Sequence, residues 1–454
     1  SAQASVAVGT YANATHVATT AIGAHANARN NFATAVGAGA QATEENGSAF
    51  GQGAMATGVY ATALGKGALA KQDYSVALGK EAAANTQLTT SIGSKTNATG
   101  FSAIAIGSGH VPPGNTVIEN IQGAQATADD SMAVGASALA NREGATALGK
   151  LSKATNNNAV AVGPDSVASG SWATATGASA NASGQASAAF GESATASGKT
   201  SIATGSHASA SGENAIASGK NAKALASNTI AIGADANATA NAAGSLAIGR
   251  GSVVNATDAT VVGPAAQANG ANATAVGRGA AANGTESAAL GRGATATGNQ
   301  SVALGQGAQA TVDSGVALGN GAVANRAARD RNTIVINTAD PSKTAGLSDN
   351  NNGGDVNTVY APVRLVDAPG ALEAIKNTIN GNKGAVSVGD SGNTRQIINV
   401  AAGSADSDAV NVAQLKAVAG GIKRYSVTSP DGSITVTNPT PGSDPQNFQI
   451  KMNT

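Results

Sequence analysis

The chain has 454 residues, of which 26 are basic and 26 acidic, so its formal net charge is zero. This balance removes any global electrostatic reason to expect nucleic acid or an anionic membrane as a partner. Aromatic residues are only 2%, cysteine is absent and glycine occurs 59 times, which excludes disulfide scaffolds, thiolate metal sites and cores of large side chains. No initiator methionine, signal peptide or bilayer-spanning apolar run is present, so we expect a mature or excised fragment without direct membrane insertion.

A 14-residue repeat runs through most of the chain. Glycine occurs 22 times in one register, the residue before it is large and apolar in 19 of 22 cases, and the residue before that is alanine in 20. An Ala-x-Ala pair, such as Ala68 and Ala70, stands near the start of each unit. Glycine can adopt the positive φ that a reversing chain needs, so we assign the repeat turn to this register. Its members include Gly9, Gly23, Gly79, Gly149 and Gly305.

Each unit contains two short segments of period two, which predicts two short strands per turn of chain. In residues 75–78, Val76 and Leu78 share one face and Ala77 lies on the other. Successive turns of chain therefore stack as a parallel ladder with a rise of about 4.8 Å. We predict an all-β solenoid over residues 1–336, with about 23 coils and a length of about 110 Å.

Alanine columns make each coil thin, so a single roll buries little apolar area, at roughly 25 cal/mol per Å². The alternation offers a second apolar face. We infer that several rolls pack side by side, although the pattern does not fix the number of chains.

Two places depart from the repeat. Residues 108–121 keep the length of one unit but lose its motif, and Pro112 and Pro113 cannot donate to a ladder. The segment is either a degenerate coil or an exposed loop, and in the second case a candidate ligand-binding bulge. Two extra residues between Gly233 and Gly249 predict a longer turn near residues 242–244.

The repeat fades after Asn325, and residues 332–337 predict a final strand. Residues 337–395 are assigned to a small mixed α/β insert or connector, with a glycine- and asparagine-rich loop followed by a short helix over 370–380. Residues 396–418 predict a strand and then a helix that begins near Asp408, which can cap it. In the tail, residues 430–432 predict the turn of a hairpin between 425–429 and 433–437.

Three motifs carry a family resemblance, and together they cover about 360 residues. Ser75-Val-Ala-Leu-Gly79 and Ser301-Val-Ala-Leu-Gly305 resemble the head repeat of the YadA-like trimeric autotransporter adhesins. Residues 398–403 resemble their connector and residues 408–415 their neck motif. The resemblance implies a left-handed parallel β-roll, a homotrimer, and a neck that joins the head to a stalk. The neck residues to which it assigns trimerisation are Asp408, Ala409, Val410, Asn411, Gln414 and Leu415.

The resemblance also implies display outside a Gram-negative outer membrane and attachment to host extracellular-matrix proteins or cell-surface receptors. We therefore expect a head over residues 1–336, the insert over 337–395, connector and neck over 396–423, and the start of a further β module over 424–454. No binding residue for a host ligand is assigned.

No catalytic residue, metal site or cofactor is predicted. His16, His25, His110 and His207 have no metal-ligand spacing and are expected at surface turns. A β-helix enzyme of the acyltransferase type is the alternative function, but it would need period six and a catalytic histidine. An ice-binding solenoid would need regular threonine columns, and threonine here is irregular.

Overall fold

The computed structural model describes residues 4–109, 122–328, 383–421, 431–437 and 449–452, together with Ala374, Asn377, Thr378 and Gly381. The chain divides into two units. The first contains the stacked coils and residues 383–394, and the second contains the described residues from 395 onward, together with Ala374, Asn377, Thr378 and Gly381.

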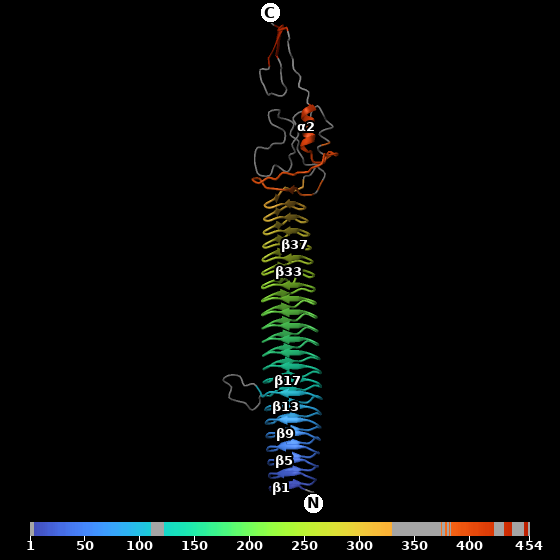
Figure 1. Cartoon of the computed structure of the whole chain (residues 1–454), viewed down its shortest axis with the longest axis vertical. Coiled ribbons are helices and arrows are strands. Elements are labelled where there is room, and N and C mark those ends of the chain that lie inside the picture. The colour runs from blue at the N-terminus through green and yellow to red at the C-terminus, as the bar shows by residue number, and fades with distance from the viewer. Residues whose placement is uncertain are drawn as a thin grey trace. The chain divides into compact units, whose positions relative to one another are not determined.

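The first unit is a parallel β-solenoid, as the 14-residue period predicts. Each coil contributes one strand to each of two sheets, and every strand pairs with its counterpart in the next coil, as Val76 does with Thr90. Figure 1 shows strands β5, β9, β13 and β17 above one another along the stack. Within the described residues, sheet A has 23 strands and sheet B has 22, close to the predicted 23 coils.

Sheet A consists of β1 (Val6–Val8), β3 (Thr20–Ile22), β5 (Thr34–Val36), β7 (Ser48–Phe50), β9 (Thr62–Leu64), β11 (Val76–Leu78), β13 (Thr90–Ile92), β15 (Ile104–Ile106), β17 (Met132–Val134), β19 (Thr146–Leu148), β21 (Val160–Val162), β23 (Thr174–Thr176), β25 (Ala188–Phe190), β27 (Ile202–Thr204), β29 (Ile216–Ser218), β31 (Ile230–Ile232), β33 (Leu246–Ile248), β35 (Thr260–Val262), β37 (Thr274–Val276), β39 (Ala288–Leu290), β41 (Val302–Leu304), β43 (Val316–Leu318) and β45 (Val386–Ser387).

Sheet B consists of β2 (Asn13–Ala14), β4 (Asn27–Ala28), β6 (Gln41–Ala42), β8 (Met55–Ala56), β10 (Leu69–Ala70), β12 (Ala83–Ala84), β14 (Asn97–Ala98), β16 (Gln125–Ala126), β18 (Leu139–Ala140), β20 (Lys153–Ala154), β22 (Val167–Ala168), β24 (Asn181–Ala182), β26 (Thr195–Ala196), β28 (Ser209–Ala210), β30 (Lys223–Ala224), β32 (Asn237–Ala238), β34 (Val253–Val254), β36 (Gln267–Ala268), β38 (Ala281–Ala282), β40 (Thr295–Ala296), β42 (Gln309–Ala310) and β44 (Val323–Ala324).

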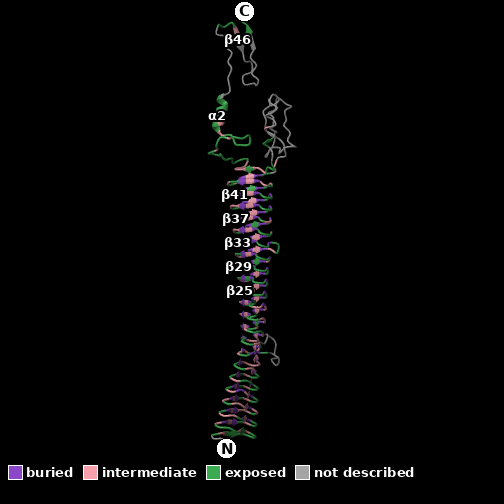
Figure 2. Ribbon diagram, turned by 90° about the vertical axis from the view of Figure 1, so that its right-hand side faces the viewer, coloured by how far each residue is buried: buried purple, intermediate pink, exposed green. Residues whose placement is uncertain are grey.

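The interior of most coils is lined by four small residues, and Val254 and Val261 are the largest fully buried side chains. In the coil that ends at Gly79 these are Ala68, Ala70, Ser75 and Ala77, all fully buried. The serine hydroxyl donates a hydrogen bond of 2.6 Å to the carbonyl of Gln72, which satisfies a polar group that burial would otherwise leave unpaired. Figure 2 shows buried and exposed residues alternating in the coils along the stack. Because the core is so thin, one chain buries little apolar area for each residue that it orders.

Two hydrogen-bonded turns close each coil. The first corner follows the repeat glycine, where the Ala82 amide donates to the Gly79 carbonyl at 3.3 Å. The second corner joins sheet B to sheet A, where the Ser75 amide donates to the Gln72 carbonyl at 3.2 Å. The third residue of each turn has a positive φ, +55° at Glu81 and +58° at Tyr74, as a type II turn requires.

The repeat glycines assigned from the sequence precede the first corner. Gly9, Gly23, Gly79, Gly149 and Gly305 have φ between +130° and +136°, a region open in practice only to glycine. A Cβ at Gly79 would lie 2.5 Å from the carbonyl oxygen of Gly93 in the next coil. Glycine is therefore required at this position of the repeat, both by the backbone conformation and by the close approach of adjacent coils.

The two irregular segments have different outcomes. Strand β15 pairs directly with β17, Ile104 with Met132, so no coil of the stack lies between these two strands. The degenerate-coil alternative is therefore excluded, and each sheet has 22 described strands before residue 325 where 23 coils were predicted. Residues 110–121 themselves lie outside the described part of the chain. The predicted longer turn before Gly249 is confirmed, because two successive turns, closed by the amides of Ala242 and Ser245, join β32 to β33.

The sheets continue beyond a long segment that separates β44 from β45. Val386 pairs with Val316, and the Val323 amide donates to the Gly389 carbonyl at 2.9 Å. This strand was not predicted from the sequence. The strand predicted over residues 332–337 and most of the helix predicted over 370–380 lie outside the described residues.

The second unit contains helix α2 (Val412–Gly421) and the antiparallel strands β46 (Ile434–Thr437) and β47 (Gln449–Met452). The helix begins four residues after the predicted start, so the prediction that Asp408 caps it is wrong. The described partner of β46 is β47, whereas the sequence predicted pairing with residues 425–429, which lie outside the described part of the chain.

Candidate functional site

The outer face of sheet A, formed by the first and third side chains of its strands, is apolar and incompletely covered. The middle residue of each strand points into the coil, as Ala63 and Ala77 do, and its neighbours point out. Leu64 is 45% exposed, Leu78 38% and Leu304 44%. A large apolar side chain stands at this third position in 19 of the 22 coils, the exceptions being Thr176, Thr204 and Ser218. Together these side chains make an apolar strip that soluble monomers seldom expose.

The corners carry most of the large polar and aromatic side chains. Tyr60 and Tyr74 occupy the positive-φ position of the second corner in adjacent coils, and their rings stack at 5.4 Å. Tyr11 and His25 do the same at the first corner, with ring centroids 5.1 Å apart. A bulky residue at positive φ is strained, so these rings are displayed at a conformational cost. The 14-residue spacing within each pair is the sequence signal that would have revealed the stacks.

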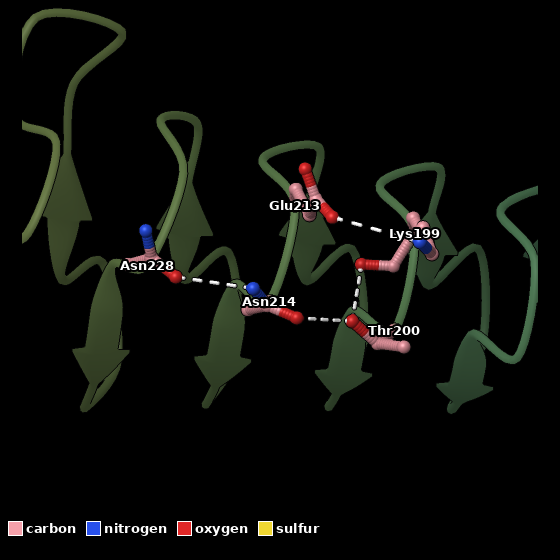
Figure 3. Close-up of polar contacts among 5 residues, drawn as sticks. All are labelled: Lys199, Thr200, Glu213, Asn214 and Asn228. Atoms are coloured by element: carbon pink, nitrogen blue, oxygen red, sulfur yellow. Dashed lines mark hydrogen bonds and ion pairs between the residues drawn. The ribbon is translucent and has the colours of Figure 1, made fainter.

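Polar side chains also form ladders along the corners. Figure 3 shows Thr200, Asn214 and Asn228 on successive coils, with the Asn214 amide donating to the Asn228 carbonyl oxygen at 3.1 Å. Beside them the Lys199 ammonium lies 3.9 Å from the Glu213 carboxylate. The ladders follow from the repeat, because equal positions in adjacent coils lie one ladder spacing apart.

The histidines described by the structure lie at exposed corners, as predicted for His16, His25 and His207, while His110 is outside the described residues. Among described residues, no group of three or more His, Cys, Asp or Glu side chains is arranged to hold a metal ion. A shallow depression of about 380 Å³ over the first corner is lined by His207, Asn221, Lys223, Asp235 and Asn237.

The predicted neck residues come together around Gln414. Its side chain accepts hydrogen bonds from the amides of Gly403 at 3.0 Å and Asn411 at 3.2 Å, and donates to the Gly403 carbonyl at 2.9 Å. In return, the Asn411 side chain accepts from the Gln414 amide at 3.0 Å. Asn411 and Gln414 thus form a capping box at the start of α2, with asparagine in place of Ser or Thr at the N-cap. The clasp between Gln414 and Gly403, which joins connector to helix, was not predicted.

Asp408 closes the preceding turn instead of capping the helix. Its Oδ2 accepts hydrogen bonds from the amides of Ser404 at 2.9 Å and Ala405 at 3.0 Å, and from the Ser404 hydroxyl at 3.3 Å. The hydrogen bond from the Ser404 amide, and next the one from the Ala405 amide, lower the pKa of this carboxyl below its usual value. Because the Asp408 carboxylate accepts these hydrogen bonds, Asn411 and not Asp408 accepts from the first turn of α2.

We expect the Asp408 turn to weaken in acid. A folded-state pKa below the unfolded value gives stability that is present above about pH 4 and is lost as pH falls through the folded pKa. Hydrogen exchange of residues 403–412, measured on the full chain and corrected for intrinsic rates, should therefore rise as the pH falls below about 4. Asp408→Asn should show that faster exchange already at pH 6, and equal protection of both proteins at pH 6 would contradict the assignment.

The other predicted neck residues, Ala409, Val410 and Leu415, are exposed, and Val412 and Val418, which were not predicted, extend their apolar surface. Val410 is 69% exposed, Val412 67%, Leu415 62% and Val418 65%. Val412, Leu415 and Val418 follow each other at steps of three along α2 and share a face. Within the described residues of this unit no neighbour covers that face.

Two protein-family models match the chain. The YadA head domain repeat matches eleven segments between residues 1 and 322, which together cover more than half of the chain. The coiled stalk of trimeric autotransporter adhesin matches residues 396–436, which include the predicted connector and neck. The chain belongs to the YadA-like trimeric autotransporter adhesins. It is therefore an adhesin built from the parallel β-solenoid of that family's head.

A solved structure, the crystal structure of the collagen-binding domain of Yersinia adhesin YadA, is also similar. Sequence identity is 23%, the match covers 49% of this chain and 84% of that one, and the TM-score is 0.29. Comparison with curated protein sequences gives no significant match. Across the described part of the adhesin, no helix combines the length and apolar character needed to cross a bilayer.

Proposed function

We propose that this chain forms the head and neck of a homotrimer, displayed on the surface of a Gram-negative bacterium, which attaches the cell to host extracellular matrix, host cells or other surfaces. The observation that carries the proposal is the outer face of sheet A, which remains apolar and partly exposed along the stack. Association of like chains through that face would bury it, and the apolar side of α2 supports the same arrangement at the neck.

We further propose the division of the adhesin into a head over residues 1–336, an insert over 337–395, connector and neck over 396–423, and a further β module from 424. The pairing of β45 with β43 supports treating the insert as part of the head, since the chain returns to the solenoid within the last part of the insert. Trimerisation is proposed for Asp408, Ala409, Val410, Asn411, Gln414 and Leu415, of which Asn411 and Gln414 fix the start of α2 and Val410 and Leu415 supply apolar surface.

Adhesion by such a rod is multivalent. Each coil repeats the same two corners, and three chains would present every corner three times. Weak contacts made together by many corners sum to strong attachment, because each further contact is intramolecular once the first has formed. The stacked tyrosines and the polar ladders are the side chains best placed to make such contacts.

The proposal is tested with the purified full chain. Light scattering should give about three times the chain mass, and the protein should be retained by at least one immobilised matrix protein from a panel of collagen, laminin and fibronectin, or by cultured host cells. A correctly assembled trimer that adheres to none of these would refute the proposed attachment. Turnover of an acyl donor would favour the enzyme alternative, which no observation on the described residues supports.

A further inference from the structure

The last quarter of the coils before the insert, residues 249–322, has its charges sorted onto opposite edges. Residues 249–322 contain three basic side chains, Arg250, Arg278 and Arg292, and all three stand at the first corner. The three acidic side chains of the same stretch stand at the second corner, and they are Asp258, Glu286 and Asp313. The chain as a whole is neutral, so the positive charge of this edge comes from the position of the arginines and not from an excess of basic residues.

Backbone hydrogen bonds hold the three arginines in one column. The carbonyl of Arg250 accepts from Ala265, that of Pro264 from Gly279, and that of Arg278 from Gly293, each at 2.9 Å. Arg278 and Arg292 are therefore one coil apart, and Arg250 lies two coils before Arg278. At a rise of about 4.8 Å per coil the column spans about 14 Å along the stack.

The surface beside this column is open. All three arginines are exposed, and none forms an ion pair with a described residue. A Cβ built at the next position along the chain, Gly251, Gly279 or Gly293, would meet no atom within 4 Å. Earlier along the same corner, Glu81, Asp165 and Asp235 occupy the corresponding position in three coils, and lysines stand at the position of the arginines in several others. Residues 249–322 differ in carrying three arginines, each followed directly by glycine.

Exposed amide side chains adjoin the arginine column. Gln267 on β36 and Gln309 on β42 lie in sheet B strands that follow the first corner. Gln306 occupies the position of the arginines one coil after Arg292. These groups donate and accept hydrogen bonds of the kind that sugar hydroxyls make. No aromatic residue occurs in residues 249–322, so this edge has no platform on which nucleic-acid bases could stack.

We propose that this edge, defined by Arg250, Arg278 and Arg292, binds a sulfated polysaccharide laid along the stack. The planar guanidinium group pairs with tetrahedral oxyanions through two parallel hydrogen bonds, and a straight column matches a linear chain of repeated sulfate groups. The inference rests on the proposed function and deepens it, since it names the chemistry of one host-surface ligand that the adhesin holds.

The test uses the assembled full chain and a size-defined heparin oligosaccharide. Arg250→Gln, Arg278→Gln and Arg292→Gln combined should weaken heparin binding at least tenfold. They should also reduce the slope of log K against log salt by about 2, because fewer counterions are released. The matched control replaces Arg29, Lys71 and Arg142, exposed basic residues near the second corner, with glutamine. It changes the net charge equally and should leave binding within twofold.

The remaining arms separate the ligand chemistries. De-sulfated heparin should bind at least tenfold more weakly than heparin, and single-stranded DNA of equal charge should not match heparin at 150 mM salt. Equal losses in the two triple variants, equal binding of the DNA, or full retention of binding without the three arginines would each overturn the proposal. Adhesion to the matrix-protein panel is measured in parallel. Its survival in the arginine variant leaves the proposed function intact even if heparin binding fails, and unchanged mass and melting temperature confirm that the variant is folded.

Discussion

Replacing Gly51 with alanine is expected to open the solenoid at that coil. Gly51 has a φ of +130°, and a Cβ there would lie 2.6 Å from the carbonyl oxygen of Gly65 in the next coil. Both obstacles are backbone, so no side-chain rotation relieves them. We expect a local loss of at least about 3 kcal/mol. Each coil contacts only its neighbours, so this should appear as fast hydrogen exchange confined to the coils around residue 51.

Gly53, two residues away in the same turn, provides the control. Its φ of +64° is one that other residues adopt at the same position, such as Tyr11 and His25, and a Cβ there meets nothing within 4 Å. Gly53→Ala should therefore cost only about 1 kcal/mol and leave the exchange of neighbouring coils nearly unchanged. Equal effects of the two substitutions would show that close approach between coils does not determine the repeat glycines.

The solenoid could be predicted because one local rule repeats. Each coil needs a glycine with φ near +130° and two small inward-facing residues before each corner, and few other folds require this pattern. A coil that lacked these residues would break the 14-residue period. For the same reason the pairing of Ile104 with Met132 could not be predicted. A segment of one repeat length keeps the register whether it forms a coil or leaves the stack, so only the ladder distinguishes the two.

The neck was harder to predict, because several polar residues compete for the same amides. Asp408 and Asn411 are both good N-caps, and the sequence favoured the first. The structure assigns Asp408 to the amides of Ser404 and Ala405, and Asn411 to the helix, since Gln414 stands three residues after Asn411 and completes a capping box. The reach of Gln414 back to Gly403 depends on the tertiary arrangement and has no local sequence signal.

The arginine column illustrates a different limit. Its three residues are visible in the sequence, and their positions follow from the 14-residue count once the two-residue insertion before Gly249 is placed. What the count does not supply is their surroundings. The open space beside Gly279 and Gly293 and the ladder bonds that align the column belong to the folded coils.

Leu64 and Leu88 provide a direct test of association through the outer face of sheet A. The two side chains are almost equally exposed in the single chain, 45% and 49%, but Leu64 lies on the outer face of β9 and Leu88 at the second corner. In an isolated chain, aspartate at either position would change stability by less than about 1 kcal/mol. Exposure alone therefore predicts no difference between the two variants.

Association of three chains through sheet A predicts a large difference. Leu64→Asp would place a carboxylate without a partner in a buried interface, which should weaken assembly by about 3 kcal/mol, roughly a hundredfold. Leu88→Asp should assemble normally, because aspartate tolerates the φ of +60° at this exposed corner. Sedimentation equilibrium over a range of concentrations measures both. Undiminished assembly of Leu64→Asp, with Leu88→Asp also unchanged, would show that the rolls do not meet through sheet A.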